Sequence, residues 1–178
     1  MFFSCHNHTE YSNFRLRDCI NRIPELINYA HELGYKGICI TEHETIAPSI
    51  KIEEYFNTVK NQEGWKDFKV GIGNEIYLCS EDVCAENRGT DVRFTFPHFI
   101  LIALDAEGHK QLRELSTRAW MRAFTHRNMM RVPTYFRDLQ EIVGSNQGHV
   151  VGASACLGGS LPQYILFIIL LVKRGSAQ

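Results

Sequence analysis

The stretch Phe2-Phe3-Ser4-Cys5-His6-Asn7-His8 opens the sequence, and the rest of the chain is interpreted around it. Its apolar residues predict a short buried strand, and side chains repeat with a period of two along a strand. His6 and His8 are therefore expected on one side of that strand, where two imidazoles can bind one cation. The pair could equally be two ordinary polar residues at a strand end, so other residues have to decide.

The composition predicts a globular domain, or part of a larger protein, with no bulk attraction to nucleic acid. Hydrophobic residues make up 44% and charged residues 22% of the 178 residues. The formal net charge of −1 gives no electrostatic reason to expect binding to nucleic acid or to an anionic membrane.

The cysteines are expected to be reduced thiols of a cytoplasmic protein, because they are scattered and follow no secretory leader. Cys39 lies in an apolar run and is interpreted as a small buried hydrophobe. Cys79 and Cys84 have a C-x4-C spacing, but no second pair completes a zinc knuckle, which favours two loop cysteines.

Hydrophobic periodicity alternates between strands and helices along the chain. Further strands are predicted at Gly37–Thr41, Lys69–Leu78, Phe99–Leu104 and His149–Ala155. Helices are predicted at Pro24–Leu33, Ser49–Asn61, Glu107–Phe124 and Pro133–Val143, and an exposed loop at Ser80–Arg93. This alternation is typical of an α/β fold with a parallel sheet or barrel.

The last part of the chain differs from the rest. Tyr164 to Val172 is a run of nine apolar residues, too short for a membrane span, which needs about 20. A buried helix is the preferred interpretation of this run.

Potential metal ligands recur near the predicted strand ends, which is where parallel α/β barrels place their active sites. His8, His43, Glu75 and Cys156 are at or near such ends, and Asp18 follows the first strand on a polar loop. His98 precedes its strand, so a parallel sheet does not explain how it would reach the others. Singly, each could be a surface, capping or core residue, but together they favour a metal centre.

These motifs resemble the polymerase and histidinol phosphatase (PHP) domain, in the version found at the N-terminus of the bacterial DNA polymerase III alpha subunit. The resemblance covers about Phe2 to Tyr164. The matching segments are His6 to Ser12, Ile40 to His43, Gly73 to Tyr77, His98 to Ala103, Gly108 to Trp120 and Ala155 to Pro162. The first two are specific for PHP domains, and the A-C-L-G-G-S-L-P segment favours the polymerase branch.

The resemblance implies a distorted (β/α)7 barrel and a metal centre that hydrolyses phosphoesters through a metal-bound water. The implied ligands are His6, His8, Asp18, His43, Glu75, His98 and Cys156. Glu42 stands where the family usually has Asp, and it is expected to orient a ligand from the second layer. The mixed N, O and S ligand set suits zinc best, with manganese or iron as alternatives.

Two departures from the family pattern lead us to expect a truncated or frame-shifted copy. No Asp-x-His pair, which forms the family's last two ligands, occurs after Cys156, and the polymerase palm is absent. We therefore expect residues 1–164 to supply about the first five strands of the barrel and residues 165–178 to form a divergent apolar tail. Polymerisation itself would lie outside this sequence.

Three functions remain open at this point. The chain resembles the N-terminal module of a replicative polymerase, with DNA and other replisome subunits as partners and 3′→5′ exonuclease activity as its chemistry. The alternatives are a free-standing PHP phosphoesterase acting on phosphate monoesters and a non-catalytic scaffold. A basic bias between Lys110 and Arg131 is interpreted as a solvated helix face, with contact to DNA as the sharper alternative.

Overall fold

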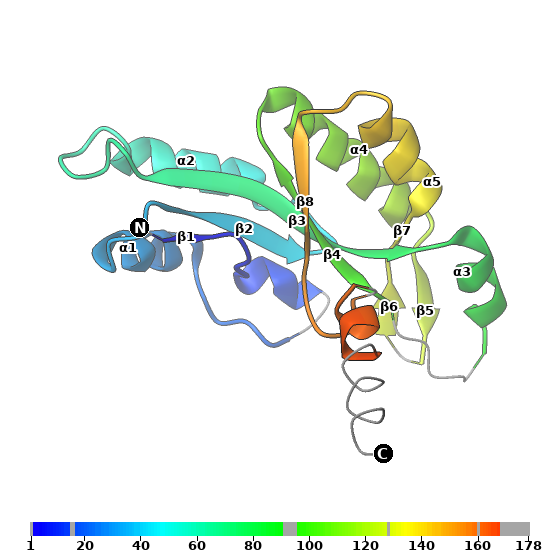
Figure 1. Cartoon of the computed structure of the whole chain (residues 1–178). Helices are drawn as coiled ribbons and strands as arrows, with labels where there is room; N and C mark the ends of the chain where they lie inside the picture. Colours follow the sequence, from blue (N-terminus) through cyan, green and yellow to red (C-terminus); the bar gives the residue numbers. More distant parts are fainter. Residues whose placement is uncertain (1, 15–16, 91–95, 128, 160, 168–178) are drawn as a thin grey trace, which may run out of the picture.

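The computed structural model describes residues 2–14, 17–90, 96–127, 129–159 and 161–167, and has a mixed α/β fold (Figure 1). The strands are β1 (Phe3–Ser4), β2 (Gly37–His43), β3 (Lys69–Cys79), β4 (His98–Ala103), β5 (Phe124–His126), β6 (Met129–Arg131), β7 (Pro133–Tyr135) and β8 (Val150–Ser154). The helices are η1 (Glu10–Phe14), α1 (Ile23–Glu32), α2 (Ser49–Val59), α3 (Glu81–Asn87), α4 (Ala106–Met121), α5 (Phe136–Leu139) and η2 (Gln140–Gly144).

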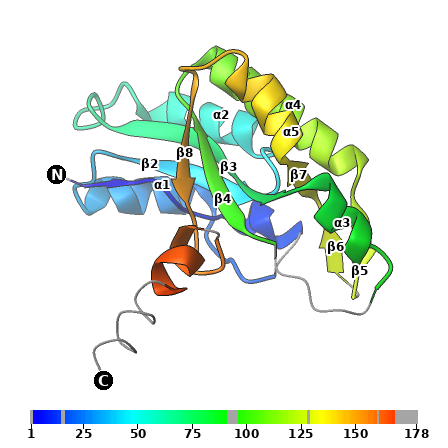
Figure 2. The same cartoon turned by 45° about the vertical axis from the view of Figure 1, so that its right-hand side comes forward.

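The main sheet has the order β1-β2-β3-β4-β8, with β7 paired to β3. It curls like part of a barrel (Figure 2). The five strands predicted from the sequence are the five along this path, which confirms the α/β class and the incomplete barrel.

The direction of β4 corrects the expectation of a wholly parallel sheet. Strands β1, β2 and β3 are parallel, whereas β4 runs antiparallel to both β3 and β8. A parallel pair needs a crossover that packs across the sheet. The short helix α3, between β3 and β4, instead lies at the periphery (Figure 1), so the chain returns alongside β3.

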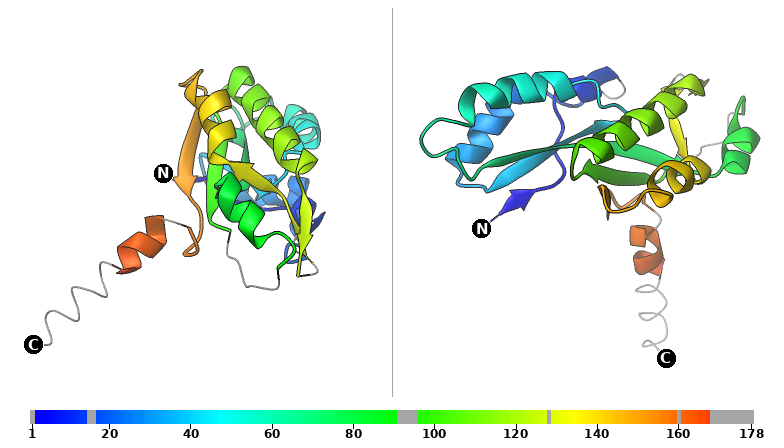
Figure 3. Two further views of the ribbon diagram at one scale, coloured as in Figure 1. Left: turned by 90° about the vertical axis from the view of Figure 1, so that its right-hand side faces the viewer. Right: turned by 90° about the horizontal axis from the view of Figure 1, so that it is seen from above.

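Helices α1, α2 and α4 cover one face of the sheet. Alternate apolar residues along each strand point to this face and pack against the helices. Ile38 and Ile40 of β2 pack with α1 and α2, and Ile76 of β3 packs with Leu112 and Leu115 of α4. In the right-hand view of Figure 3, α2 (cyan) and α4 (light green) both lie along this side. Glu75 alternates with Ile76 along β3 and therefore belongs to the opposite, concave face.

Helix boundaries follow local sequence signals. Asp105 precedes α4 and its carboxylate accepts a hydrogen bond from the Gly108 N–H at 2.9 Å, which satisfies a free helix donor. Gly34, just past α1, adopts φ of 73°, a conformation that glycine reaches at little cost. Among the described residues, no helix is long and apolar enough to cross a membrane.

Several local predictions were wrong, including the expected loop placement of Cys79 and Cys84, which lie in β3 and α3. Phe2 and Phe3 were expected in a buried strand, but they are 56% and 38% exposed, and β1 ends at Ser4. The loop expected over Ser80–Arg93 contains α3, which begins after Ser80 and has two acidic residues in its first turn. The helix expected from Pro133 begins only at Phe136, because β7 takes the three residues before it.

Candidate metal centre

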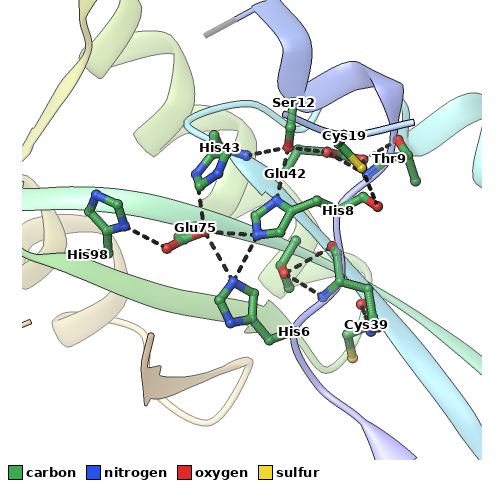
Figure 4. A network of polar contacts seen from close by, with 12 residues as sticks. His6, His8, Thr9, Ser12, Cys19, Cys39, Glu42, His43, Glu75 and His98 are labelled. Carbon is green, nitrogen blue, oxygen red and sulfur yellow. Dashed lines mark hydrogen bonds and ion pairs between the residues drawn. The ribbon is translucent and has the colours of Figure 1, made fainter. Parts of the chain in front are cut away.

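Four histidines converge on the carboxylate of Glu75 (Figure 4). One oxygen, Oε2, lies 3.1 Å from His6 Nε2, 3.0 Å from His8 Nε2 and 3.1 Å from His43 Nδ1. The other oxygen, Oε1, lies 2.8 Å from His98 Nδ1. Glu75 is only 1% exposed, so it forms the floor of the cluster.

His43, Glu75 and His98 come from three different strands of the sheet. His43 ends β2, Glu75 lies opposite it in the register of β3, and His98 begins β4. Because β4 is antiparallel, its first residue reaches the edge at which β2 ends. This strand direction supplies the route to the centre that the sequence did not reveal for His98.

The loop carrying His6 and His8 is fastened to β2 by the residue between them. The Asn7 carboxamide donates to the Cys39 carbonyl at 2.8 Å, and the Thr41 N–H donates to the Asn7 carbonyl at 2.8 Å. The two histidines lie beyond β1, so strand alternation is not what brings them together. Their Nε2 atoms nevertheless lie 2.9 Å apart.

A buried polar layer behind the histidines fixes the tautomer of His8. The Ser12 hydroxyl donates its single proton to Glu42 and accepts a hydrogen bond from the backbone N–H of His43 at 3.1 Å. It must therefore also accept at the 2.9 Å contact with His8 Nδ1, which places a proton on Nδ1. With Nδ1 protonated, the Nε2 lone pair of the neutral ring is available to a cation, whereas a proton on Nε2 would be donated to Glu75. Glu42 thus acts on His8 through Ser12, although it neighbours His43 in sequence.

Glu42 is held in place by Thr9 as well as by Ser12. The Thr9 N–H donates to both carboxylate oxygens of Glu42 at 3.1 Å, and the Thr9 hydroxyl makes a further hydrogen bond. Glu42 and Thr9 are both nearly inaccessible to solvent. These bonds offset the cost of burying the Glu42 charge.

Glu44 fastens the end of β2 to three other segments. Its N–H donates to the Glu75 carbonyl at 2.8 Å, and its carbonyl accepts from Trp120 Nε1 at 2.8 Å. Its carboxylate accepts the Val132 N–H at 3.2 Å. The backbone of Glu44 has φ of 57°, which is strained for a residue other than glycine, and these bonds hold it there.

The electrostatics of the centre favour an ionised Glu75. Burial alone opposes the charged carboxylate, but the contacts from His43, His6, His8 and His98 outweigh it. Together they hold the pKa of Glu75 well below its usual range. The centre therefore combines one buried negative charge with four imidazoles.

The geometry fits a divalent cation better than a purely hydrogen-bonded cluster. His43 Nδ1 is buried and has no hydrogen-bond partner among the described residues, despite its 3.1 Å separation from Glu75 Oε2. Facing lone pairs on His6 and His8 at 2.9 Å would repel unless a proton or a cation lay between them. Imidazole and carboxylate donors together suit zinc, manganese or iron.

The ligand atoms form two groups that share Glu75: His6, His8 and Glu75 in one, and His43, Glu75 and His98 in the other. Five of the seven residues selected from the sequence are thus brought together. Asp18 and Cys156 are exposed and belong to neither group within the described part of the chain. Their role as ligands stays a prediction.

Sequence reasoning missed the residues that support the ligands. Thr9 and Ser12 lie in the matching segment His6 to Ser12, but no role was assigned to them or to Glu44, because what they do depends on which backbone and ring atoms they meet after folding. Tyr77 lies two residues after Glu75 and so shares its face of β3. That spacing was the one available signal for its place beside the centre.

Part of the basic segment forms ion pairs within the chain. Arg118 contacts Glu114 at 2.7 Å, Glu141 at 2.9 Å and Asp138 at 3.4 Å. Arg122 also pairs with Asp138. These contacts favour a helix face over a surface reserved for DNA for the part of the run in α4, whereas Arg131 lies in β6 and falls outside that interpretation.

Comparison with known families now places the chain. The PHP domain family matches residues 4–175, so this chain belongs to the PHP domain family. Its sequence relatives include DNA polymerases. It is 37% identical over 176 residues to the probable DNA polymerase YorL of Bacillus subtilis, covering 98% of this chain and 13% of that protein. It is 29% identical over 164 residues to the DNA polymerase III subunit alpha of Helicobacter pylori, covering 92% of this chain and 12% of that protein.

Among solved structures, a putative metal-dependent phosphoesterase from Bifidobacterium adolescentis aligns with a TM-score of 0.41 and 18% identity. The alignment covers 68% of this chain and 35% of the phosphoesterase. This chain spans only 13% and 12% of the lengths of the two polymerase relatives named above.

Proposed function

We propose that this chain is the metal-binding PHP module of a replicative DNA polymerase of the DNA polymerase III alpha type. Its proposed activity is phosphodiester hydrolysis at a DNA 3′ end. The observation that carries the proposal is the convergence of four imidazoles on the buried carboxylate of Glu75. The polymerase names of its relatives support DNA as the substrate, and other replisome subunits are the expected partners, in the cytoplasm.

The residues of this chain would divide the work as follows. His6, His8, His43, Glu75 and His98 would hold a divalent transition metal, with zinc favoured by the nitrogen-rich donor set. Such a metal supplies Lewis-acid activation of water and of phosphoryl oxygens. Ser12 and Glu42 keep His8 in the tautomer that binds through Nε2. Glu44 keeps the backbone of His43 next to that of Glu75.

One observation favours a second candidate, a non-catalytic scaffold that retains part of a metal site. Asp18 and Cys156 remain outside the two ligand groups of the described residues. Fewer ligands would loosen a metal position, and phosphoester hydrolysis depends on metals that hold both the nucleophile and the phosphate. Such a module would bind metal without turning over substrate.

Metal binding is tested with chain that has been stripped by a chelator and reloaded with zinc. Elemental analysis should show bound zinc in the wild type and a large loss in the His6→Ala/His8→Ala double variant. His149→Ala is the matched control, because His149 pairs with Asp105 beyond the opposite end of β4. Equal zinc in all three chains would contradict the metal centre.

Activity is tested separately on the reloaded chain. A single-stranded oligonucleotide labelled at its 5′ end and p-nitrophenyl phosphate are compared at equal concentration. We expect metal-dependent shortening of the oligonucleotide from its 3′ end, abolished in the double variant. Turnover of the small ester alone would favour a free-standing phosphoesterase. Zinc binding with neither activity would favour the scaffold.

A further inference from the structure

Two cysteines face each other beyond the metal centre, one on the strand face that carries Glu75 and the other on a helix. Cys79 ends β3 and Cys84 lies in α3, and their sulfur atoms are 2.9 Å apart. Both are free thiols and are almost completely buried, with 4% and 3% exposure. A disulfide bond has a length of about 2.05 Å, so only a small movement separates this contact from a covalent bond.

Helix α3 packs on the rest of the chain through Cys84, and Glu81 adds an exposed ion pair with Arg137 at 3.0 Å. Cys84 is its one buried residue, while Glu81, Asp82, Ala85 and Glu86 are exposed. The helix is seven residues long and projects at the edge of the molecule (Figure 2). A short peripheral helix with so little buried surface opens at low free-energy cost. Small oxidants can therefore reach the sulfur atoms even though the closed form buries them.

The surroundings of the pair make the two sulfur atoms unequal. The hydrogen bond from Cys79 lowers the pKa of the Cys84 thiol, and Arg88, Tyr135 and Arg122 add to this against the effect of burial. The same hydrogen bond, together with burial, raises the pKa of Cys79. Cys84 is thus the better nucleophile, because the thiolate is the form that reacts. Cys79 is placed to resolve the product.

We propose that Cys79 and Cys84 are a reversible dithiol–disulfide modification site, oxidised by hydroperoxides. The Cys84 sulfur attacks the peroxide, the O–O bond breaks, and the products from hydrogen peroxide are a sulfenic acid and water. The Cys79 sulfur then attacks the sulfenic sulfur, the S–O bond breaks, and a second water leaves. In total two thiols and one hydrogen peroxide give one disulfide and two waters. This site is independent of the proposed phosphoesterase activity.

The disulfide would lock α3 to the end of β3. Cys79 shares its strand face with Tyr77 and Glu75, since these positions alternate along β3. The ring of Tyr77 stacks on His98 with centroids 4.2 Å apart. The disulfide would therefore form at the end of β3, on the strand face that carries Glu75 and Tyr77.

The sequence offers a direct test, because trypsin releases both cysteines in one peptide. Cleavage after Lys69 and Arg88 gives residues 70–88, which contain Cys79 and Cys84 and no other cysteine. The folded full chain, kept in chelator, is treated with hydrogen peroxide, alkylated with iodoacetamide, digested and analysed by mass spectrometry. We expect the peptide to lose two hydrogens and to take up no alkyl group. Dithiothreitol before alkylation should restore both alkylation sites.

Single variants distinguish a disulfide from oxidation of separate thiols. In Cys79→Ser, Cys84 should accumulate as a sulfenic acid that a cyclic 1,3-dione traps, and the loss of two hydrogens should disappear. In Cys39→Ala, which removes a buried thiol elsewhere, the disulfide should form as in the wild type. The proposal would be overturned if the peptide of residues 70–88 stayed fully alkylated while the peptides containing the exposed Cys5 and Cys156 were oxidised.

Discussion

Tyr77 and His98 stack face to face, with ring centroids 4.2 Å apart and ring planes inclined by 8°. They are direct partners in the register of the antiparallel strands β3 and β4, so sheet pairing itself positions the imidazole. Tyr77 is only 2% exposed and also approaches His43 edge-on, with centroids 6.4 Å apart. One aromatic ring thus supports two of the four histidines.

Replacing this ring should weaken metal binding without removing any ligand. Tyr77→Leu is expected to lower the free energy of unfolding by about 1–3 kcal/mol and to reduce zinc affinity, because His98 loses its stacking partner. Tyr77→Phe keeps the ring and is the matched control. Chemical denaturation and competition with a chromophoric chelator measure the two effects. Equal zinc affinity in Tyr77→Leu and wild type would show that the stack does not position His98.

Ser12 links Glu42 to both His8 and His43, so its hydroxyl should matter more than its size. Ser12→Ala is expected to reduce metal affinity by about 10- to 100-fold, as for other groups that orient metal-bound histidines. Ser49→Ala is a matched control, since Ser49 is also buried but its hydroxyl donates to the Ile46 carbonyl. Chelator competition on both variants is the measurement. A Ser12→Ala affinity within twofold of the control would contradict the link.

The hydrogen bond from the Val132 N–H to the Glu44 carboxylate predicts that the Glu44 side chain contributes to stability. Glu44→Ala should lower the free energy of unfolding by about 1–3 kcal/mol, because the buried Val132 N–H loses its acceptor. Glu44→Gln retains an oxygen in that position and should be the milder change. Urea denaturation of the two variants compares them directly. A more stable Ala variant than Gln variant would mean that the Val132 bond contributes little.

Asp138 predicts a pH dependence of stability. Burial opposes its charge, but the contacts with Arg122 and Arg118 outweigh burial and lower the pKa below the ordinary value of 3.8. A lowered folded pKa means that the stabilisation is present above the unfolded pKa and is lost as pH falls through the folded pKa. The difference between wild type and Asp138→Asn should therefore be steady from neutral pH down to about pH 5 and shrink below about pH 4.

Urea denaturation of wild type and Asp138→Asn across this pH range is the measurement. We expect a loss of about 1–3 kcal/mol at neutral pH, since the variant leaves buried polar groups partly unpaired. Glu141→Gln is the control, because Glu141 also contacts Arg118 but is exposed, and its effect should be smaller. A difference that grows as the pH falls would have the wrong sign for this ion pair.

The sequence predicted which segments form the five strands along the main sheet and the main members of the centre. Alternating hydrophobic runs located the five strands, and His6, His8, His43 and Glu75 stood out because polar ligand types interrupt or end apolar runs. Strand direction was not predictable, because a buried strand has the same pattern whichever way it runs. His98 therefore had no route to the centre until its partner Tyr77 was known.

The remaining differences between the predicted and the observed structure arise where two local sequence signals favour different structures. The segment Ser80–Arg93 is polar enough for a loop, yet Ser80 caps a helix by accepting the Val83 N–H at 3.3 Å. The Cys79–Cys84 spacing indicates no particular structure until that helix turns Cys84 back toward β3. Asp18 and Cys156 were selected by their places near predicted strand ends and by the resemblance, and neither signal shows where folding places their side chains.

The place of His98 at the start of β4 would also delay completion of the proposed metal centre while the chain is being synthesised. The candidate ligand atoms come from position 6 at one extreme and position 98 at the other. A ribosome that has released only β1, β2 and β3 holds a nascent chain in which His98 is still inside the exit tunnel. Metal can then be captured by at most part of the ligand set. Completion of the proposed centre would therefore require the β3–β4 pairing, which brings His98 opposite Tyr77.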